Sequence, residues 1–475
     1  MWLKKVNEEG DMNQSKPQIH FIGIKGVGMS ALALVANGLG HNVSGSDVNE
    51  QFITDQSLQD AGIFVASGFN ADHIPTDTGL VVVGGSFDQN NPEVIAAKQR
   101  NLQILTYSEF LGQLSDDQKT IAIAGTHGKT TTTALLAYIF EQSGEKPSYV
   151  IGTGSVAGLK APGAAGEGEY FITEADDYKR SVADPTPKFL DLKPYAAIVT
   201  SIEHDHPDLF PTLQSCTDAF VKFATKLRPD GFLVVNADDA GVTSLRAIIT
   251  NKKVISYGHD NGADYRITLS QTDAESPVRF SLVTATTTYG PFELGLRGRH
   301  NLSNAAAAVT MALELGLSPA KIQAILPTFE SVERRYDYVG KRGEIDIYDD
   351  YAHHPTAVAV TLETLRIQYR RRPLWCVFQP HTYSRTKALL EEFGAAFGAA
   401  SMVIITDIYA SARETEVTVT ANELVRAIAA NRDSVQYVSH DTLEKYLKEN
   451  LPSNAVLVTM GAGDIYKIGR ALLDS

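Results

Sequence analysis

The segment from Gly125 to Thr133 reads GTHGKTTTT and follows four apolar residues, Ile121 to Ala124. This pattern predicts a buried strand, a glycine turn and the start of a helix. Backbone N–H groups in such a turn point at anionic oxygens, and the helix dipole favours negative charge there. Lys129 adds a positive charge for the outer phosphates, and the Thr130 hydroxyl can hold Mg²⁺. The alternative is an ordinary glycine-rich turn between a strand and a helix.

A second glycine turn, Gly26 to Ala31, fits the pattern G-x-G-x-x-G/A after a strand at Ile19–Gly23. Asp47 lies about 20 residues further on, where such sites hold a ribose hydroxyl. Taken alone, this pattern favours NAD, although glycine turns of this kind bind any diphosphate or serve only close packing. Together with the first turn, it predicts a nucleotide-linked substrate as well as ATP.

Acids and histidines follow two further strands. Glu174 to Asp177 comes after the predicted strand Tyr170–Thr173, and Ser201 to His206 follows Ala196–Thr200. Carboxylates at the carboxyl end of a strand beside a phosphate loop can hold the Mg²⁺ that Thr130 contacts. A histidine there is a second metal ligand or a base, or it is structural. A solvated acidic turn is the alternative for the first cluster.

Two polar clusters near the C-terminus also follow strands. Asp349 to Pro355 (DDYAHHP) comes after Ile345–Tyr348, and Gln379 to Thr386 (QPHTYSRT) comes after Leu374–Phe378. Because carboxyl ends of parallel strands meet at one sheet edge, these clusters predict a site there. Either could instead be an ordinary loop.

Two shorter groups could contact a nucleotide. His300 and Asn304 could read a base edge, while Asn301 could instead cap the helix that follows. Arg334 and Arg335 could reach phosphates, or could be a solvated surface pair.

Strands alternating with helical patterns predict a parallel, doubly wound sheet in residues 1–116 and further α/β sheets in residues 117–328 and 329–475. The polar stretch Ser115–Lys119 is predicted to be a linker. A β-rich part, Lys253–Arg297, precedes helices from Asn301 to Leu326.

Composition limits the remaining classes. The 475 residues carry a net charge of −14, which argues against nonspecific binding to nucleic acid. No apolar run is long enough to span a bilayer, and the first residues lack a hydrophobic signal core. Two cysteines provide no disulfide framework, so we expect a cytoplasmic protein without a membrane partner.

Taken in order, these segments resemble the Mur ligases of peptidoglycan synthesis, over nearly the whole chain. The motifs are FIGIKGVGMS from Phe21, GTHGKTTTT from Gly125, EADD from Glu174, EHDH from Glu203, GRHNLSNA from Gly298, DDYAHHP from Asp349, QPHTYSRT from Gln379 and GAGD from Gly461. The resemblance implies a Rossmann-like N-terminal domain for a UDP-sugar, a central P-loop ATPase domain, and a Rossmann-like C-terminal domain that closes over the site. The first glycine turn would then bind UDP-N-acetylmuramate rather than NAD.

Within the family, the motifs are most similar to those of the members that add L-alanine. The resemblance therefore implies an enzyme that uses ATP and Mg²⁺ to join L-alanine to the carboxylate of UDP-N-acetylmuramate through an acyl phosphate. We expect a monomer or a weak dimer.

The resemblance also implies roles for individual residues. The catalytic residues would be Lys129, Glu174, His206 and His353, with Thr130, Glu174 and His206 holding metal. The ATP contacts would be Gly125, Thr126, His127, Gly128, Lys129, Thr130, Thr131, His300, Asn304, Arg335 and Asp350. The contacts to UDP-N-acetylmuramate and the amino acid would be Gly26, Val27, Gly28, Met29, Ser30, Asp47, Ser86, Tyr351, His381 and Arg385.

The chain departs from the family pattern at several positions. Lys25 replaces a glycine, and Thr382 stands where the alanine ligases generally carry an arginine. The loss of that cation predicts weaker binding of the amino acid or readier acceptance of serine or glycine. One rival function is the recycling ligase that attaches a tripeptide to the same muramate. Two others are an NAD-linked dehydrogenase, which would not need the loop at Gly125, and a nucleotide-binding switch, which would not need the histidine clusters.

Overall fold

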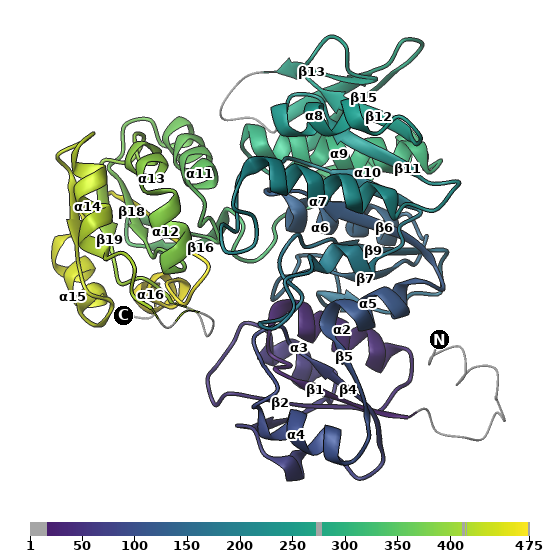
Figure 1. The fold of residues 1–475 in the computed structure, drawn as a ribbon. Coiled ribbons are helices and arrows are strands. Elements are labelled where there is room, and N and C mark those ends of the chain that lie inside the picture. Colours follow the sequence, from purple (N-terminus) through teal and green to yellow (C-terminus); the bar gives the residue numbers. More distant parts are fainter. Residues whose placement is uncertain (1–16, 272–277, 411–413, 415, 474–475) are drawn as a thin grey trace.

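The computed structural model describes residues 17–271, 278–410, 414 and 416–473 (Figure 1). Three sheets, each accompanied by helices, follow one another along the chain. We call each sheet, together with the helices that pack on it, the first, second or third region in chain order. The predicted α/β class is confirmed. Each predicted boundary falls between two sheets, and the limits themselves remain predictions.

The first sheet is parallel throughout, in the order β3-β2-β1-β4-β5. Its strands are β1 Gln18–Ile22, β2 Val43–Asp47, β3 Phe64–Ser67, β4 Thr78–Val83 and β5 Gln103–Thr106. Its helices are α2 Val27–Gly38, α3 Asp55–Asp60, α4 Pro92–Gln99 and α5 Tyr107–Ser115, with a 3₁₀ turn, η1, at Ala71–His73. The strand order reverses between β1 and β4, so the loops after these two strands border a crevice of the kind that binds nucleotides.

The second sheet has the order β15-β14-β13-β12-β11-β10-β6-β9-β7-β8. Its strands are β6 Lys119–Ala124, β7 Ser148–Val150, β8 Gly163–Ala164, β9 Tyr170–Glu174, β10 Ala196–Val199, β11 Phe232–Asn236, β12 Lys253–Gly258, β13 Tyr265–Gln271, β14 Val278–Val283 and β15 Thr288–Leu294. Its helices are α6 Lys129–Gln142, α7 Leu213–Thr225, α8 Ala240–Ile248, α9 Arg299–Glu314 and α10 Pro319–Ile325, with 3₁₀ turns η2 Lys188–Asp191 and η3 Leu326–Thr328. Strands β6, β9 and β10 are parallel neighbours, so their carboxyl-end loops lie together.

The third sheet has the order β16-β17-β21-β18-β19-β20, with only β16 antiparallel to its neighbour. Its strands are β16 Asp337–Arg342, β17 Ile345–Asp350, β18 Leu374–Phe378, β19 Met402–Ile405, β20 Val435–Tyr437 and β21 Val456–Met460. Its helices are α11 Pro355–Gln368, α12 Tyr383–Ala388, α13 Leu390–Ala396, α14 Ala421–Ala429, α15 His440–Asn450 and α16 Tyr466–Leu473.

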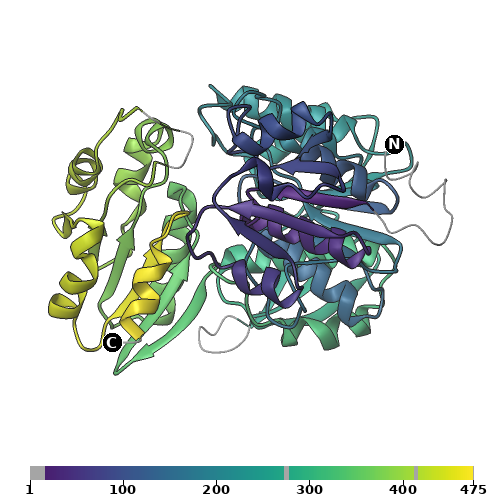
Figure 2. The same cartoon turned by 90° about the horizontal axis from the view of Figure 1, so that it is seen from below.

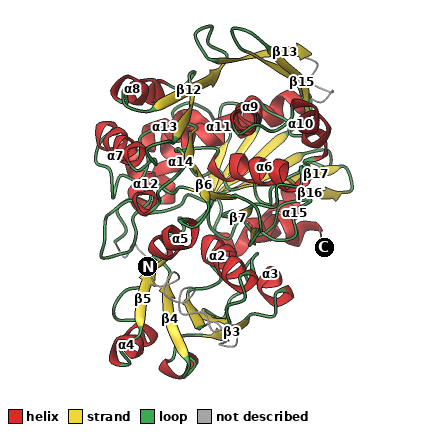
Figure 3. Ribbon diagram, turned by 90° about the vertical axis from the view of Figure 1, so that its right-hand side faces the viewer, coloured by secondary structure: helices red, strands yellow, loops and turns green. Residues whose placement is uncertain are grey.

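The first and second regions share a hydrophobic core, whereas the third region has its own. One cluster of buried side chains runs from Ile19 in the first region to Ile249 in the second, through α2 and α5, which lie between the two sheets (Figures 1 and 3). The buried clusters of the third region instead hold residues from Ile345 to Leu472. Viewed from below, the third region stands to one side of the other two (Figure 2).

The structure corrects two local predictions. The predicted linker at Ser115–Lys119 is shorter, because Ser115 ends α5 and Lys119 begins β6. Asn301 is not the N-cap of α9: Gly298 is, and the Asn301 side-chain amide donates to the Arg297 carbonyl (2.8 Å) from within the first turn.

Candidate active site

The phosphate-type loop joins β6 to α6, as the sequence predicts. Gly128 is the N-cap of α6 with φ +79°, and a Cβ there would lie 2.3 Å from Oδ1 of Asn304. Gly125 has φ +138°, and its Cβ would lie 2.1 Å from Oγ1 of Thr200. Both positions therefore require glycine. Asn304, a predicted ATP contact, packs directly on the loop.

Lys129 points back into this loop. Its Nζ donates to the Gly125 carbonyl oxygen (2.6 Å) and forms an ion pair with Asp177 (3.4 Å). Burial would lower the pKa of the ammonium, but the nearby carboxylates of Asp177, Asp176 and Glu174 outweigh it and raise the pKa. The side chain therefore stays charged at the point where phosphate oxygens would lie.

Thr130 and Glu174 meet at the carboxyl ends of β6 and β9. The Thr130 hydroxyl donates to Oε2 of Glu174 (3.0 Å), and the Gly152 amide donates to Oε1 (2.5 Å). Nη2 of Arg335, from the third region, donates to the same hydroxyl oxygen (2.9 Å). The Thr130 hydroxyl and the Glu174 carboxylate are hard oxygen donors that suit Mg²⁺. In this structure the guanidinium group of Arg335 is the cation that contacts the Thr130 hydroxyl. The donor set therefore fits the predicted metal.

His206, the third predicted metal ligand, lies in a separate cluster with Arg385. Its Nδ1 is 3.4 Å from Nη2 of Arg385, and its Nε2 is 3.6 Å from Oδ2 of Asp205. Nε of Arg385 donates to Oδ1 of Asp205 (2.8 Å), which ties the third region to the second. Burial would raise the pKa of Asp205, but His206 and Arg385 hold it well below its usual range.

The predicted amino-acid pocket groups Tyr351, His353 and His381 around Arg385. The ring centroids of Tyr351 and His353 lie 5.4 Å apart, and those of His353 and His381 lie 5.9 Å apart. Nη1 of Arg385 lies 3.3 Å from Nδ1 of His381. Burial and the charge of Arg385 lower the pKa of His353 well below its usual range, and lower that of His381 to about 3. Both imidazoles are therefore neutral near pH 7.

Asp350, a predicted ATP contact, is bound within its own region. Its carboxylate accepts from the Tyr336 amide (3.1 Å), the Ala352 amide (2.8 Å) and the Thr361 hydroxyl (2.9 Å). It therefore shapes the turn after β17, and a contact with ATP remains a prediction. His300 lies at the junction of the second and third regions, with its ring centroid 6.4 Å from that of Tyr336.

In the first region, Asp47 organises the glycine turn. Its Oδ2 accepts from the Lys25 amide (2.7 Å), and its Oδ1 accepts from the Val48 amide (2.8 Å). The predicted turn residues, Gly26 to Ser30, begin α2, and Ser86 follows β4 across the crevice. Asp47 thus positions the loop, and a direct contact with a ribose remains a prediction.

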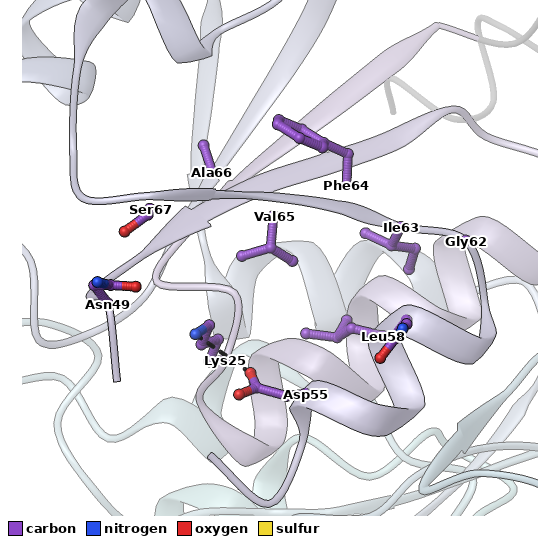
Figure 4. A pocket seen from close by; sticks show the side chains of 11 residues that line it. Lys25, Asn49, Asp55, Leu58, Gly62, Ile63, Phe64, Val65, Ala66 and Ser67 are labelled. Carbon is purple, nitrogen blue, oxygen red and sulfur yellow. Dashed lines mark ion pairs between the residues drawn. The ribbon is translucent and has the colours of Figure 1, made fainter. Parts of the chain in front are cut away.

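A cavity of about 490 Å³ lies beside this turn, between α3 and β3 (Figure 4). Its polar end carries Lys25, which pairs with Asp55 (3.4 Å). Val65 points toward the helix from β3, while Phe64 points to the opposite face of that strand. The lining residues are Lys25, Asn49, Asp55, Leu58, Gln59, Gly62, Ile63, Phe64, Val65, Ala66 and Ser67. The cavity has the size and mixed lining of a small-ligand site.

Sequence reasoning missed two features of the site, which are Lys188 and the ion pair between Asp205 and Arg385. Nζ of Lys188 lies 5.2 Å from the ring centroid of Tyr107 and 5.4 Å from that of Tyr178, and it is 3.6 Å from Oδ2 of Asp176. It therefore places a cation between the first region and the carboxylates of the second. Lys188 belongs to no motif, so only its position in space reveals it.

In the part of the chain that the structure describes, no helix combines the length and apolar character needed to cross a membrane.

Three Mur ligase family models match successive parts of the chain. The model for the "Mur ligase family, catalytic domain" matches residues 18–119, the "Mur ligase middle domain" matches 123–312, and the "Mur ligase, glutamate ligase domain" matches 334–463. Together they cover all three sheets.

Curated relatives match over nearly their full length. The UDP-N-acetylmuramate–L-alanine ligase of Desulfitobacterium hafniense is 38% identical over 96% of this chain and 99% of the relative. That of Alkaliphilus metalliredigens is 35% identical over 98% of each.

Two solved structures share the fold over 96% of this chain and 98% of theirs, both at 25% identity. The UDP-N-acetylmuramate-alanine ligase of Thermotoga maritima superposes with a TM-score of 0.79. The murein peptide ligase of Psychrobacter arcticus superposes with a TM-score of 0.76.

Proposed function

The chain belongs to the Mur ligase family, and from this premise we propose that it joins L-alanine to UDP-N-acetylmuramate, with conversion of ATP to ADP, in peptidoglycan precursor synthesis. The observation that carries the proposal is the agreement, over nearly the full chain, with relatives that bear this activity in their names. The strand-end clusters support it, because the second and third regions bring a phosphate-type loop and a histidine pocket to one junction.

The reaction has two steps. The muramate carboxylate attacks the γ-phosphorus of ATP, which forms an acyl phosphate and releases ADP. The neutral amine of L-alanine then attacks the acyl carbon, and phosphate leaves from the tetrahedral intermediate. Both steps need alignment of large substrates, so positioning and electrostatic stabilisation supply most of the rate.

Lys129 supplies charge to the first step. Its ammonium lies inside the loop that we propose for the phosphates, and it remains protonated beside three carboxylates. Thr130 and Glu174 would hold Mg²⁺, which offsets charge on the transferring phosphoryl group when bound, and His206, in its separate cluster, would be a ligand of a second metal ion. Arg335 now lies against Thr130 and would remain close to the phosphates.

The second step needs a base for the amine and a cation for the carboxylate of L-alanine. His353 is the proposed base: its Nδ1 donates to the Tyr351 carbonyl oxygen (2.8 Å), so Nε2 carries the lone pair that would take a proton from the amine. Nε of Arg385 donates to Asp205, whereas among the described residues its two Nη groups make only long contacts, 3.3 and 3.4 Å, with ring nitrogens. Those N–H groups are proposed to bind the amino-acid carboxylate.

The UDP-sugar is assigned to the first region. The glycine turn after β1 would contact the diphosphate through backbone N–H groups and Lys25, and the cavity beside α3 offers room for an attached group. All of these residues belong to one chain, and the predicted monomer or weak dimer stays a prediction that light scattering can test.

The test is a phosphate-release assay with UDP-N-acetylmuramate, ATP, Mg²⁺ and one amine at a time. We expect release that depends on both the UDP-sugar and L-alanine. Faster turnover of the tripeptide than of L-alanine would instead identify the recycling ligase, a possibility that Thr382 makes worth testing. Release without any amine would indicate a nucleotide switch, and reduction of NAD without ATP would indicate a dehydrogenase.

A further inference from the structure

Three metal-binding side chains meet where the phosphate-type loop faces the third region. They are His127 in the loop, Glu203 after β10, and His354 before α11. One nitrogen from each histidine and one carboxylate oxygen lie within 4.8 Å of one another. Nε2 of His127 is 3.3 Å from Oε2 of Glu203, and Nδ1 of His354 is 3.7 Å from the same oxygen.

The histidine nitrogens are poorly satisfied. Nε2 of His127 is buried and has the Glu203 carboxylate at 3.3 Å, but forms no well-aligned hydrogen bond with it, and Nε2 of His354, the second nitrogen of that ring, is buried without a hydrogen-bond partner among the described residues. His354 is 6% exposed, and its ring centroid lies 4.8 Å from that of His127. A buried nitrogen without a partner is costly, and it is unusual enough to need an explanation.

The charge states also suit a cation. Burial and the neighbouring His127 lower the pKa of His354 to about 4, so its ring is neutral near pH 7. Burial would raise the pKa of Glu203, but its contacts with His127 and with the Thr356 hydroxyl lower it to about 2. A neutral imidazole at His354 and a carboxylate at Glu203 are the forms in which those two side chains bind metals.

We propose that His127, Glu203 and His354 form a site for a transition-metal ion of the Zn²⁺ class, separate from the Mg²⁺ site at Thr130. Ligand bonds of about 2.0–2.2 Å in a tetrahedron place ligand atoms roughly 3.3–3.6 Å apart, close to the two separations observed. Two imidazoles and one carboxylate favour Zn²⁺ or Co²⁺ over Mg²⁺, which prefers oxygen ligands.

The surroundings already orient one ligand. The Thr356 hydroxyl donates to Oε2 of Glu203 (2.7 Å), which fixes the carboxylate as second-shell hydrogen bonds do in metal sites. Nδ1 of His354 accepts from the Thr356 amide at 3.3 Å, a long bond that an ion at this nitrogen would replace. Because His127 and His354 come from different regions, the ion would cross-link the loop to the third region.

The full chain, without ATP, can be titrated with Co²⁺ in millimolar Mg²⁺ while its visible absorption is followed. We expect one equivalent of Co²⁺ to bind, to be displaced by Zn²⁺, and to resist Mg²⁺. His354→Gln and His127→Gln should each weaken binding at least ~10-fold. The matched control is His204→Gln on the same loop as Glu203, because Nε2 of His204 already contacts the Phe210 carbonyl (2.9 Å) and should not contribute.

Thermal melting checks that each variant is folded. If His354→Gln does not fold, Thr356→Val keeps the shape, removes the hydrogen bond to Glu203, and should still weaken Co²⁺ binding several-fold. Loss of Co²⁺ binding in Glu174→Gln with full binding in His354→Gln would overturn the proposal, since the ion would then occupy the Thr130 site. Absence of Co²⁺ binding by the wild-type chain would overturn it as well.

Discussion

The two junctions between regions are built from different chemistry. The first and second regions share one buried apolar cluster, and in it α5 of the first region contacts η2 of the second, which carries the buried Phe189. The second and third regions meet through polar contacts, such as Arg335 with Thr130 and Arg385 with Asp205. A continuous core holds two regions rigidly, whereas hydrogen bonds and ion pairs exchange readily with water and ligands. We therefore expect the polar junction to be the one that opens for substrates.

Backbone strain is concentrated at the polar junction. Six described residues other than glycine have positive φ, and four of them lie here: His206 (+53°), Arg334 (+61°), Tyr336 (+51°) and Thr382 (+69°). A β-branched residue such as Thr382 adopts this conformation rarely. Strain of this kind persists where surrounding contacts demand it, and it gathers at functional sites.

The largest expected effect is on stability at the apolar junction. Phe189 is fully buried, and Phe189→Ala should lower the free energy of unfolding by about 3–5 kcal/mol. Calorimetry should show the first and second regions unfolding in one transition, and Phe189→Ala should lower the temperature of that transition as a whole. Phe397→Ala in the core of the third region is the matched control, and it should shift a separate transition. A single transition shifted equally by both variants would contradict the distinction between the junctions.

The next effect is on catalysis at the polar junction. Lys129→Ala should lower kcat by about 10²–10³-fold, or about 3–4 kcal/mol, because it removes the charge proposed for the transferring phosphate. Steady-state phosphate release measures this, and circular dichroism verifies the fold. The control is Lys119→Ala at the start of β6, the strand that leads into the loop, because the ion pair of Lys119 with Glu169 is largely exposed. Near-normal turnover in folded Lys129→Ala would exclude the proposed role.

Variants of the Arg385–Asp205 ion pair can distinguish a role of Arg385 in binding L-alanine from a role in holding the second and third regions together. Arg385→Ala should raise KM for L-alanine at least ~10-fold, about 1.4 kcal/mol of lost charge-assisted binding. Asp205→Asn weakens the ion pair but keeps the guanidinium, so it should raise KM less. Equal increases in the two variants would mean that Arg385 acts by holding the regions together rather than by binding the substrate.

The smallest effect is a pH dependence at the polar junction. Burial lowers the pKa of His300 from 6.5 to about 4, so the unfolded chain binds its proton first as the pH falls. The resulting stability is present above pH 6.5 and is lost as the pH falls toward 4. Between pH 7 and pH 6, the free energy of unfolding of the wild type should fall by about 0.7 kcal/mol more than that of His300→Leu, measured by urea unfolding. Identical losses would show that His300 titrates normally.

The sequence predicted the strands that carry the clusters better than the edges of the sheets. β6, β10 and β17 end at Ala124, Val199 and Asp350, directly before or within the polar clusters, and a strand was predicted at each position. The edge strands β3, β8 and β20 were not predicted, because each is only two to four residues long. Residue type alone suggests Asn301 as the N-cap of α9, but in the structure Gly298 occupies that position.

By itself, the sequence determined the α/β class, the glycine turns and the polar clusters at strand ends, because these depend on local periodicity and on the conformational freedom of glycine. Only the tertiary structure decided which clusters meet. Arg335 reaches Thr130 and Arg385 reaches Asp205 because two sheet edges face each other. Lys188 lies between Tyr107 and Tyr178 for the same kind of reason. Such pairings join residues up to 205 positions apart, and the spacing along a chain holds no information about how separately folded sheets pack.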